Sequence, residues 1–282
     1  MKKILITGEN SYIGNSFEMW LAKDTHCYKV EKISVRGDSW KEIDFSSYDT
    51  VLHVAGIAHL NERKVDKNLY YKVNRDLAYE IANKAKTEGV EHFIFFSSMS
   101  VYGKDTGIID KDTVTKPKSH YGKSKLEAER LIRELEDPQY KVSVIRPPMI
   151  YGRGCNGNYA KLSSLTRITL VFPDIKNERS MIYIDNLNEY IKSLVDNPIN
   201  GLFFPQDREY VCTSEMVKEI AKSIDKRIWM TKVFNSFLKN IKTDLTRKIF
   251  GDLVYSKEID VNYRHKSYNL VDFKESIRLT EE

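Results

Sequence analysis

The sequence predicts an α/β protein with a Rossmann-type, doubly wound parallel sheet and a small C-terminal substrate-binding lobe. Short apolar segments, typical of buried strands, alternate with helix-period segments through the first half of the chain. The first of these strands leads through a glycine-containing turn into a helix. Polar residues follow the ends of successive strands, where open parallel sheets bind their ligands.

The elements are expected in regular order up to about residue 152, after which the alternation becomes irregular. Strands are expected where β-branched and aromatic residues cluster, and helices where apolar residues recur every three to four positions. The expected strands are 2–7, 28–35, 50–54, 92–97 and 142–146, and the expected helices are 15–23, 69–88, 119–136, 214–223 and 233–250.

The N-terminal segment predicts an anion-binding site. The strand over residues 2–7 runs into Gly8-Glu-Asn-Ser-Tyr-Ile-Gly14 and then into a helical pattern. The N–H groups and the dipole at a helix N-terminus favour a negatively charged ligand such as a phosphate. We therefore expect a dinucleotide-binding domain over residues 1–152. Residues 153–282 would form mainly a substrate-binding lobe, with a segment near 179–196 returning to the first domain.

Tyr121 and Lys125 are one helical turn apart in a segment with a helical pattern. Residues at this spacing share a helix face, about 5–6 Å apart. An ammonium near a phenol favours the phenolate, by about 4 kcal/mol at 4 Å and an effective dielectric near 20. Since one pKa unit is worth about 1.4 kcal/mol, the pKa of Tyr121 is expected to fall from about 10 to about 7. Such a tyrosine can exchange a proton with an alcohol or sugar hydroxyl.

Composition adds few constraints. The net charge of +5 is small for 282 residues and does not indicate nucleic-acid binding. No segment approaches the roughly 20 apolar residues of a membrane span, and no signal peptide is expected. Cys27, Cys155 and Cys212 are odd in number and widely separated, which predicts neither a disulfide framework nor a zinc cluster. A cytoplasmic location is expected.

Seven ordered motifs resemble those of the extended short-chain dehydrogenase/reductase superfamily, in its NAD-dependent epimerase/dehydratase branch. The resemblance extends over nearly the whole chain. The second half is similar to polysaccharide-pathway enzymes that act at C4 of UDP-hexoses, as 4-epimerases or 4-keto reductases. The motifs are Thr7-Gly-Glu-Asn-Ser-Tyr-Ile-Gly14, His53-Val-Ala-Gly56, Val73-Asn74, Ser97-Ser-Met-Ser-Val-Tyr-Gly103, Tyr121-Gly-Lys-Ser-Lys125, Arg146-Pro-Pro-Met-Ile-Tyr-Gly152 and Arg179-Ser-Met-Ile-Tyr-Ile-Asp-Asn186.

The resemblance implies three catalytic residues. Ser98 would hydrogen-bond the reacting hydroxyl or ketone, Tyr121 would be the general acid/base, and Lys125 would hold the nicotinamide ribose and tune Tyr121. It also implies NADP(H) or NAD(H) as cofactor and a UDP-sugar as substrate. A homodimer is compatible with the resemblance, and no nucleic-acid or membrane partner is expected. The predicted cofactor-binding residues are Gly8, Asn10, Ser11, Tyr12, Ile13, Gly14, Arg36, Asp44, Phe45, Val54, Ala55, Gly56, Asn74, Ser97, Tyr121, Lys125, Pro147 and Pro148, and the predicted substrate-binding residues are Ser98, Met99, Met149, Asn158 and Arg179.

Two positions depart from the family pattern. Ser11 replaces the middle glycine of the phosphate loop, where a side chain can hinder the approach of the pyrophosphate. Its hydroxyl could donate to a phosphate oxygen instead, so we expect altered affinity rather than loss. Arg36 follows the second strand, where an acidic residue would bind the ribose of NAD and an arginine accommodates the 2′-phosphate of NADP. We therefore expect NADP(H) to be accepted, the alternative being that Arg36 is a solvated surface charge.

Two net reactions share this machinery. A 4-epimerase keeps its NAD⁺ and returns the hydride to the other face of the sugar, whereas a 4-keto reductase releases oxidised cofactor each cycle. Arg36 slightly favours the reductase. A 4,6-dehydratase is less favoured because Ser98-Met99 stands where that reaction typically uses an Asp-Glu pair. A non-catalytic dinucleotide sensor on the same fold is the rival from another class, and the retained Tyr121 and Lys125 argue against it.

Some residues have simpler interpretations. His53 and His59 flank the Ala-Gly turn, but no further ligands surround them at metal-binding spacing, so no metal is expected. Met99 and Met149 could contact substrate, although methionines more often fill irregular apolar gaps. The basic, amphipathic segment 232–248 could lie on a membrane surface. A packed helix with a solvated lysine face is the favoured interpretation of that segment.

Overall fold

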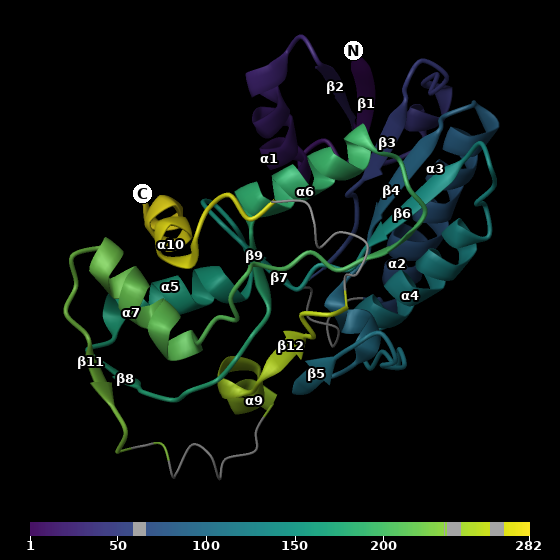
Figure 1. The fold of residues 1–282 in the computed structure, drawn as a ribbon. Helices are drawn as coiled ribbons and strands as arrows, with labels where there is room; N and C mark the ends of the chain where they lie inside the picture. The colour runs from purple at the N-terminus through teal and green to yellow at the C-terminus, as the bar shows by residue number, and fades with distance from the viewer. Residues whose placement is uncertain (59–65, 234, 236–243, 260–267) are drawn as a thin grey trace. The chain divides into compact units, whose positions relative to one another are not determined.

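The computed structural model describes residues 1–58, 66–233, 235, 244–259 and 268–282 (Figure 1). His59 therefore lies outside the described residues. The chain forms two compact units and passes between them repeatedly. Unit 1 contains Met1–Gly103, Val114–Pro147 and Asn188–Pro205, and unit 2 contains Lys104–Thr113, Pro148–Leu187 and Gln206–Glu282.

The centre of unit 1 is a six-stranded parallel sheet with the strand order β10-β6-β4-β3-β1-β2. The order turns outward in both directions from the β1–β3 neighbours, which is the switch point of a doubly wound sheet. The predicted fold class is confirmed. The strands are β1 (Lys2–Thr7), β2 (Tyr28–Ile33), β3 (Thr50–His53), β4 (His92–Phe96), β6 (Lys141–Ile145) and β10 (Gly201–Phe203).

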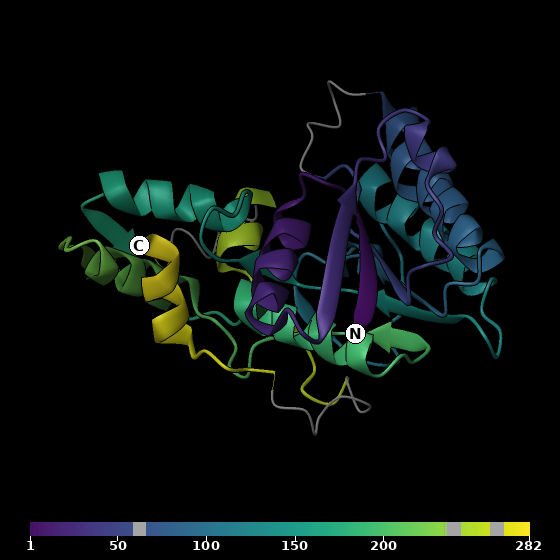
Figure 2. The same ribbon diagram turned by 90° about the horizontal axis from the view of Figure 1, so that it is seen from above.

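Helices cover both faces of this sheet. Figure 2 shows α1 and the unit 1 part of α6 on one side of the strands, and α3 and α4 on the other. Because both faces are covered, the inner strands are mostly apolar, and all five residues of β4 are buried, whereas the edge strand β2 mixes charged and apolar residues. The helical elements of unit 1 are α1 (Tyr12–Leu21), α2 (Lys67–Tyr71), the π-helical turn η3 (Lys72–Asp76), α3 (Leu77–Thr87), the 3₁₀ turn η4 (Met99–Tyr102), α4 (His120–Arg133) and the end of α6 (Ile184–Asp196).

Helix α4 begins where the side chain of Ser119 accepts a hydrogen bond from the N–H of Gly122, at 3.1 Å. Its inner face packs on the sheet through Ala128 and Ile132, which belong to the same core as Phe93 of β4. Burying a large apolar side chain such as Ile132 or Phe93 stabilises the fold by about 1.5–3 kcal/mol. The packing holds the first turn of α4 in a defined position beside the end of β4.

Unit 2 contains three two-stranded parallel pairs and several helices. The pairs are β7 (Met149–Tyr151) with β9 (Met181–Tyr183), β8 (Val171–Pro173) with β11 (Trp229–Thr231), and β5 (Gly107–Ile109) with β12 (Leu253–Tyr255). The helices are α5 (Asn158–Ile168), the start of α6, α7 (Thr213–Ser223), α9 (Asp244–Phe250) and α10 (Phe273–Glu281).

Three expectations differ from the structure. The single boundary at 152 misses β10, which returns to the sheet of unit 1 by pairing with β6 but has only three residues and so a weak sequence signal. The returning segment begins at Asn188 rather than near 179, because β9 pairs with β7 in unit 2. Val233 is not helical, because Thr231 ends β11 and its side chain accepts the N–H of Val233 in a turn.

Among residues 1–58, 66–233, 235, 244–259 and 268–282, no helix is both long enough and apolar enough to span a bilayer.

Candidate functional site

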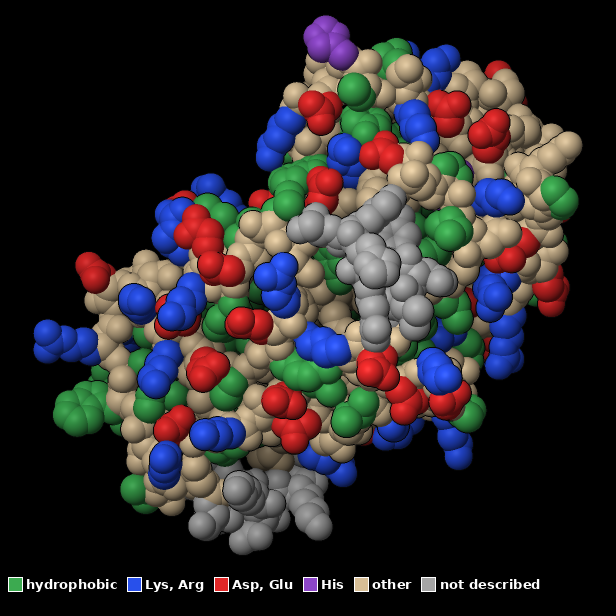
Figure 3. Space-filling view, in the orientation of Figure 1, with side chains coloured by type: hydrophobic (Ala, Val, Ile, Leu, Met, Phe, Trp, Pro, Cys, Tyr) green, Lys and Arg blue, Asp and Glu red, His purple; other side chains and the backbone are tan. Residues whose placement is uncertain are grey.

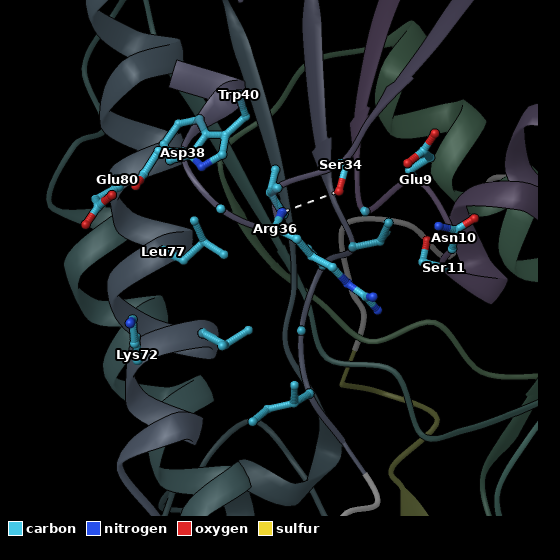
Figure 4. A pocket seen from close by; sticks show the side chains of 18 of the residues that line it. Glu9, Asn10, Ser11, Ser34, Arg36, Asp38, Trp40, Lys72, Leu77 and Glu80 are labelled. Carbon is cyan, nitrogen blue, oxygen red and sulfur yellow. Dashed lines mark hydrogen bonds between the residues drawn. The ribbon is translucent and has the colours of Figure 1, made fainter. Parts of the chain in front are cut away.

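A cavity of about 820 Å³ lies in unit 1, beyond the ends of β1, β2 and β3 (Figure 4). This is the side of a doubly wound sheet where ligands bind. The predicted residues that line it are Gly8, Asn10, Ser11, Arg36, Val54, Ala55 and Gly56. Sequence reasoning missed Glu9, Ser34, Val35, Gly37, Asp38, Trp40, Lys41, Ile57, Lys72, Val73, Asp76, Leu77 and Glu80, which also line it.

The turn after β1 is tightly packed. Gly8 has φ +117°, and a Cβ there would come within 3.0 Å of the backbone nitrogen of Ala55. Ser11 is the N-cap of α1, and its hydroxyl oxygen accepts the N–H of Gly14 at 3.0 Å. The hydroxyl hydrogen of Ser11 can still donate to a ligand. The residue that replaces the usual glycine thus stabilises the helix start at which an anion would bind.

Arg36 extends its side chain into the cavity, as Figure 4 shows. Its backbone N–H lies 3.4 Å from the hydroxyl oxygen of Ser34. Asp38 also lines the cavity and forms an ion pair with Lys41 at 2.8 Å. A hydrogen bond from Lys41 lowers the pKa of Asp38. The cavity therefore contains an arginine, which suits a phosphate, and an ionised carboxylate, which suits a ribose hydroxyl.

Eleven predicted cofactor-binding residues do not line this cavity, and five of them lie close to β1 and β2 in the sequence. Phe45 is fully buried in the core, and the carboxylate of Asp44 accepts the N–H of Ser46 at 2.8 Å. Instead, Trp40, Leu77 and Glu80 are at the cavity wall. Trp40 lies in a 3₁₀ segment between β2 and β3, Ser39–Glu42, that sequence periodicity does not reveal, and the roles of Asp44 and Phe45 toward the cofactor stay predictions. The others are Tyr12, Ile13 and Gly14, in the first turn of α1.

Ser98 and Tyr121 are brought together at the end of β4. A side-chain hydrogen bond joins them, and the oxygen of Ser98 also accepts the N–H of Ser100 at 3.1 Å. The helix and the η4 turn approach closely at Gly122, where a Cβ would fall 2.7 Å from the carbonyl oxygen of Ser100. A glycine next to Tyr121 therefore permits the contact between the two predicted catalytic side chains.

Lys125 is buried one turn further along α4. Its amino group donates to the carbonyl oxygen of Phe96 at 2.8 Å and lies 4.7 Å from the centre of the Phe95 ring. Burial lowers the pKa of Lys125 to about 8, and the carboxylate of Glu129 opposes this shift. The lysine thus remains mostly charged at neutral pH.

The expected lowering of the Tyr121 pKa is wrong for the free protein. Burial raises the pKa of Tyr121, and the hydrogen bond from Ser98 opposes that effect. The i+4 spacing on α4 was correct, but the amino group of Lys125 donates to the end of β4. Desolvation of the phenol therefore dominates, and at neutral pH the neutral form of Tyr121 is favoured.

A buried polar network lies next to these residues. Glu129 accepts a hydrogen bond from the hydroxyl of Ser97 and two from Arg146, one from its Nε at 3.0 Å and one from its Nη2. Arg146 also donates to the hydroxyl of Tyr102 at 2.9 Å. The carboxylate and the guanidinium are almost fully buried. Ser97 therefore points toward Glu129, and its predicted role in cofactor binding remains a prediction.

Asn74 connects the loop after β3 to α4. Its amide exchanges hydrogen bonds with the backbone of Ile57, at 2.9 and 3.1 Å, and donates to the hydroxyl of Ser124 at 3.2 Å. A Cβ at Gly56 would come within 3.0 Å of the Asn74 side-chain oxygen and 3.3 Å of the Lys125 nitrogen. The buried amide thus supports the loop that lines the cavity.

The remaining predicted residues need only brief placement. Pro147 is buried at the end of β6, and its carbonyl accepts the N–H of Met99 at 3.0 Å, whereas Pro148 is buried in unit 2. Met149, Asn158 and Arg179 also belong to unit 2. Met149 begins β7 and Asn158 begins α5. The guanidinium of Arg179 donates a hydrogen bond to the carbonyl of Gly251 at 2.9 Å. Their roles toward a substrate stay predictions.

His53 is a core residue. It stacks with the rings of Phe93 and Phe95, and its Nδ1 lies 2.7 Å from the hydroxyl of Thr7. Burial lowers its pKa to about 3, so the ring is neutral. Within the described ranges, no three His, Cys, Asp or Glu side chains are grouped so that they could hold a metal ion.

A tyrosine one helical turn before a buried lysine, on a doubly wound sheet whose first strand leads through a glycine turn into a helix, is the arrangement expected of a dinucleotide-dependent α/β enzyme. The chain belongs to the NAD dependent epimerase/dehydratase family, whose model matches residues 4–201. The cofactor class expected from the sequence, NAD(H) or NADP(H), agrees with this family.

Curated relatives agree with that assignment, and a solved structure shares the fold. The UDP-glucose 4-epimerase of Vibrio cholerae is 30% identical over 295 residues, covering 93% of this chain and 88% of that protein. The N-acetyl-alpha-D-glucosaminyl-diphospho-ditrans,octacis-undecaprenol 4-epimerase of Escherichia coli O157:H7 is 30% identical over 190 residues, covering 65% of this chain and 57% of that protein. The UDP-glucuronic acid 4-epimerase of Bacillus cereus in complex with NAD shares the fold, with a TM-score of 0.77 at 18% identity over 99% of this chain and 97% of that one.

Proposed function

We propose that this protein transfers a hydride between a nicotinamide dinucleotide and C4 of a UDP-hexose. The observation that carries the proposal is the hydrogen bond between Ser98 and Tyr121, adjacent to the buried Lys125 on the same helix. The near full-length similarity to the Vibrio cholerae UDP-glucose 4-epimerase supports C4 as the reacting carbon.

The cavity fits a dinucleotide. Gly8 leaves room for a pyrophosphate to approach the backbone closely, and the N-terminus of α1 favours a negatively charged ligand. The guanidinium of Arg36 could bind a phosphate through two parallel hydrogen bonds. A bound nicotinamide would supply the hydride acceptor, or the donor in its reduced form. Val54, Ala55 and Gly56 line the cavity from the loop after β3.

The chain's own residues would handle the proton and the charge. Tyr121 would take the proton of the C4 hydroxyl in the oxidising direction and return it to the ketone in the reducing direction. Ser98 would orient the sugar oxygen by a hydrogen bond. Lys125, whose pKa is about 8, would stabilise negative charge as it develops on Tyr121. Because burial favours the neutral phenol in the free protein, Tyr121 is ready to act as the acid.

Two net reactions remain candidates, and different observations favour them. Both curated relatives described above are named as 4-epimerases, which supports 4-epimerisation with a retained cofactor. The guanidinium of Arg36 in the cavity supports NADPH-dependent 4-keto reduction. We take 4-epimerisation as the first candidate because the similarity to the Vibrio cholerae protein covers 93% of this chain.

The nucleotide carried by purified, denatured protein distinguishes these reactions. Near-stoichiometric NAD⁺ is the expected result for a 4-epimerase. A protein without nucleotide that binds NADPH more tightly than NADH would instead support the 4-keto reductase.

The sugar donor would be held through its diphosphate. Both relatives are named for sugars joined to a diphosphate, and Asn158 and Arg179 are our candidates for binding that group. Burial lowers the pKa of the half-buried Arg179, with Asp252 opposing. An arginine nevertheless stays charged, and it can bind phosphate with two parallel hydrogen bonds.

Replacing Tyr121 tests the catalytic proposal. Tyr121→Phe is expected to lower kcat with UDP-glucose or UDP-N-acetylglucosamine by about 10²–10⁴-fold, the usual contribution of general acid–base catalysis. Tyr79→Phe, on α3 and outside the lining of the cavity, is the matched control. Undiminished turnover by Tyr121→Phe would remove the central claim.

A further inference from the structure

Several large apolar side chains of unit 2 are exposed at one place. Trp229 is 76% exposed, Ile168 79% and Val233 81%. Leu170 and Val171 are exposed as well. We call these five residues, Ile168, Leu170, Val171, Trp229 and Val233, the β8–β11 apolar patch.

The backbone brings the patch residues together. Trp229 and Val171 are register partners at the start of β11 and β8, so their side chains stand on the same face. The N–H of Trp229 donates to the carbonyl of Leu170 at 2.9 Å. Ile168 ends α5, two residues separate it from the start of β8, and Val233 follows the end of β11. The patch is therefore built on a paired, defined segment.

The interior side of the same strands is well packed. Phe172, which follows Val171, is buried, and its ring lies 5.8 Å from the ring of Phe250. The exposure of the patch residues is thus not caused by poor packing of the core beneath them. A contiguous exposed apolar patch on a packed scaffold is typical of a surface that binds a partner or a membrane.

Cations accompany the patch. The segment 222–233 contains Lys222, Lys226, Arg227 and Lys232 against a single acid, Asp225. The amino group of Lys226 donates to the carbonyls of Thr166 and Arg167 at 2.9 and 2.6 Å, which holds a positive charge beside the end of α5. Around β8 and β11, Figure 3 shows Lys and Arg side chains, with Asp and Glu side chains among them, beside projecting hydrophobic ones.

Two of the nearby cations are paired with acids, Arg167 with Glu281 at 2.6 Å and Lys222 with Glu219 at 3.7 Å. Lys226, Arg227 and Lys232 still outnumber the neighbouring acids Asp174 and Asp225. Arg227 and Lys232 are exposed on either side of β11. The surface therefore combines tryptophan and aliphatic side chains with a net positive charge.

We propose that the β8–β11 apolar patch docks on the surface of an anionic phospholipid membrane. Tryptophan favours the boundary between head groups and acyl chains, and lysine and arginine are attracted to anionic lipids. A second copy of the chain would bring the same positive charges together, which disfavours self-association. The proposal replaces the expectation of no membrane partner and does not depend on the reaction catalysed.

Sedimentation of the full chain with vesicles tests the proposal. Binding to vesicles that contain phosphatidylglycerol is expected to exceed binding to pure phosphatidylcholine vesicles and to fall as salt is added. Trp229→Ser is expected to lower binding about tenfold, and Arg227→Glu with Lys232→Glu should remove the preference for anionic lipid. Val114→Ser is the control, because Val114 is 79% exposed in unit 1.

Two further readouts keep the test decisive. Wild type should show a blue-shifted tryptophan emission with anionic vesicles, and Trp229→Ser should lack that shift while retaining the wild-type thermal unfolding temperature. Absence of wild-type binding, or equal binding to neutral and anionic vesicles, would overturn the proposal. So would a dimer in sedimentation velocity that Trp229→Ser dissociates, since the patch would then bind a second copy. Turnover of UDP-sugars is measured separately, so failure of the proposed function is distinguishable.

Discussion

The amino group of Lys125 donates a hydrogen bond to the carbonyl oxygen of Phe96 at 2.8 Å. This contact joins the inner face of α4 to the end of β4, one residue before Ser97 and two before Ser98. The lysine therefore has a structural anchor in addition to its proposed chemical role. It holds α4 against the end of β4, from which the chain continues to Ser98 and η4, and the first prediction depends on that geometry.

Gly122→Ala is expected to lower kcat by at least about tenfold with little change in KM. The added Cβ would fall 2.7 Å from the carbonyl oxygen of Ser100 and separate η4 from α4, which weakens the contact between Ser98 and Tyr121. Steady-state kinetics with a UDP-sugar checks this. Lys123→Ala, on the exposed side of the same helix turn, should have wild-type kinetics.

Arg36→Ala and Asp38→Ala should shift nucleotide preference in opposite directions. Removing the guanidinium should weaken NADPH binding about tenfold or more with a smaller effect on NADH, because the 2′-phosphate loses its charged partner. Removing the carboxylate should weaken NADH more than NADPH. Calorimetric titration of each protein with both nucleotides measures the effects. Equal affinities in Arg36→Ala and wild type would show that Arg36 is only a surface charge.

Glu129→Gln is expected to destabilise the fold by about 3–5 kcal/mol, because it leaves Arg146 buried without its carboxylate. It should also move the alkaline limb of the pH–rate profile to lower pH, since Glu129 raises the pKa of Lys125 against the effect of burial. Urea unfolding and kcat against pH provide the two readouts. A merely structural role for Glu129 would change the stability and leave the profile in place.

His92→Gln should make the protein less sensitive to acid. Burial lowers the pKa of His92 from 6.5 to about 3, so the unfolded chain binds more protons than the folded one between these pH values. The stability is fully present above pH 6.5 and is lost as the pH falls, by about 2 kcal/mol for this residue at pH 5. The difference in unfolding free energy between pH 7.5 and 5 should be smaller in His92→Gln. A similar change in exposed His26→Gln would contradict this account.

Sequence reasoning was most reliable where a local pattern controls the structure. The inner strands of the parallel sheet contain runs of buried apolar residues because both faces are covered, so β1, β3 and β4 could be expected from these runs. It was least reliable where short elements carry the geometry. The three-residue strand β10 and the 3₁₀ turn that places Asp38 and Trp40 at the cavity have no distinctive periodicity.

The sequence by itself determined the fold class, the glycine turn between β1 and α1, and the family to which the chain belongs. These follow from residue types at fixed spacing. Tertiary structure alone decided that burial dominates the pKa of Tyr121, that Phe45 packs in the core, and that Trp229 stays in contact with water. The burial and exposure of a side chain depend on residues that are distant in the chain, and the spacing of residues along the sequence does not show which of these will be its neighbours.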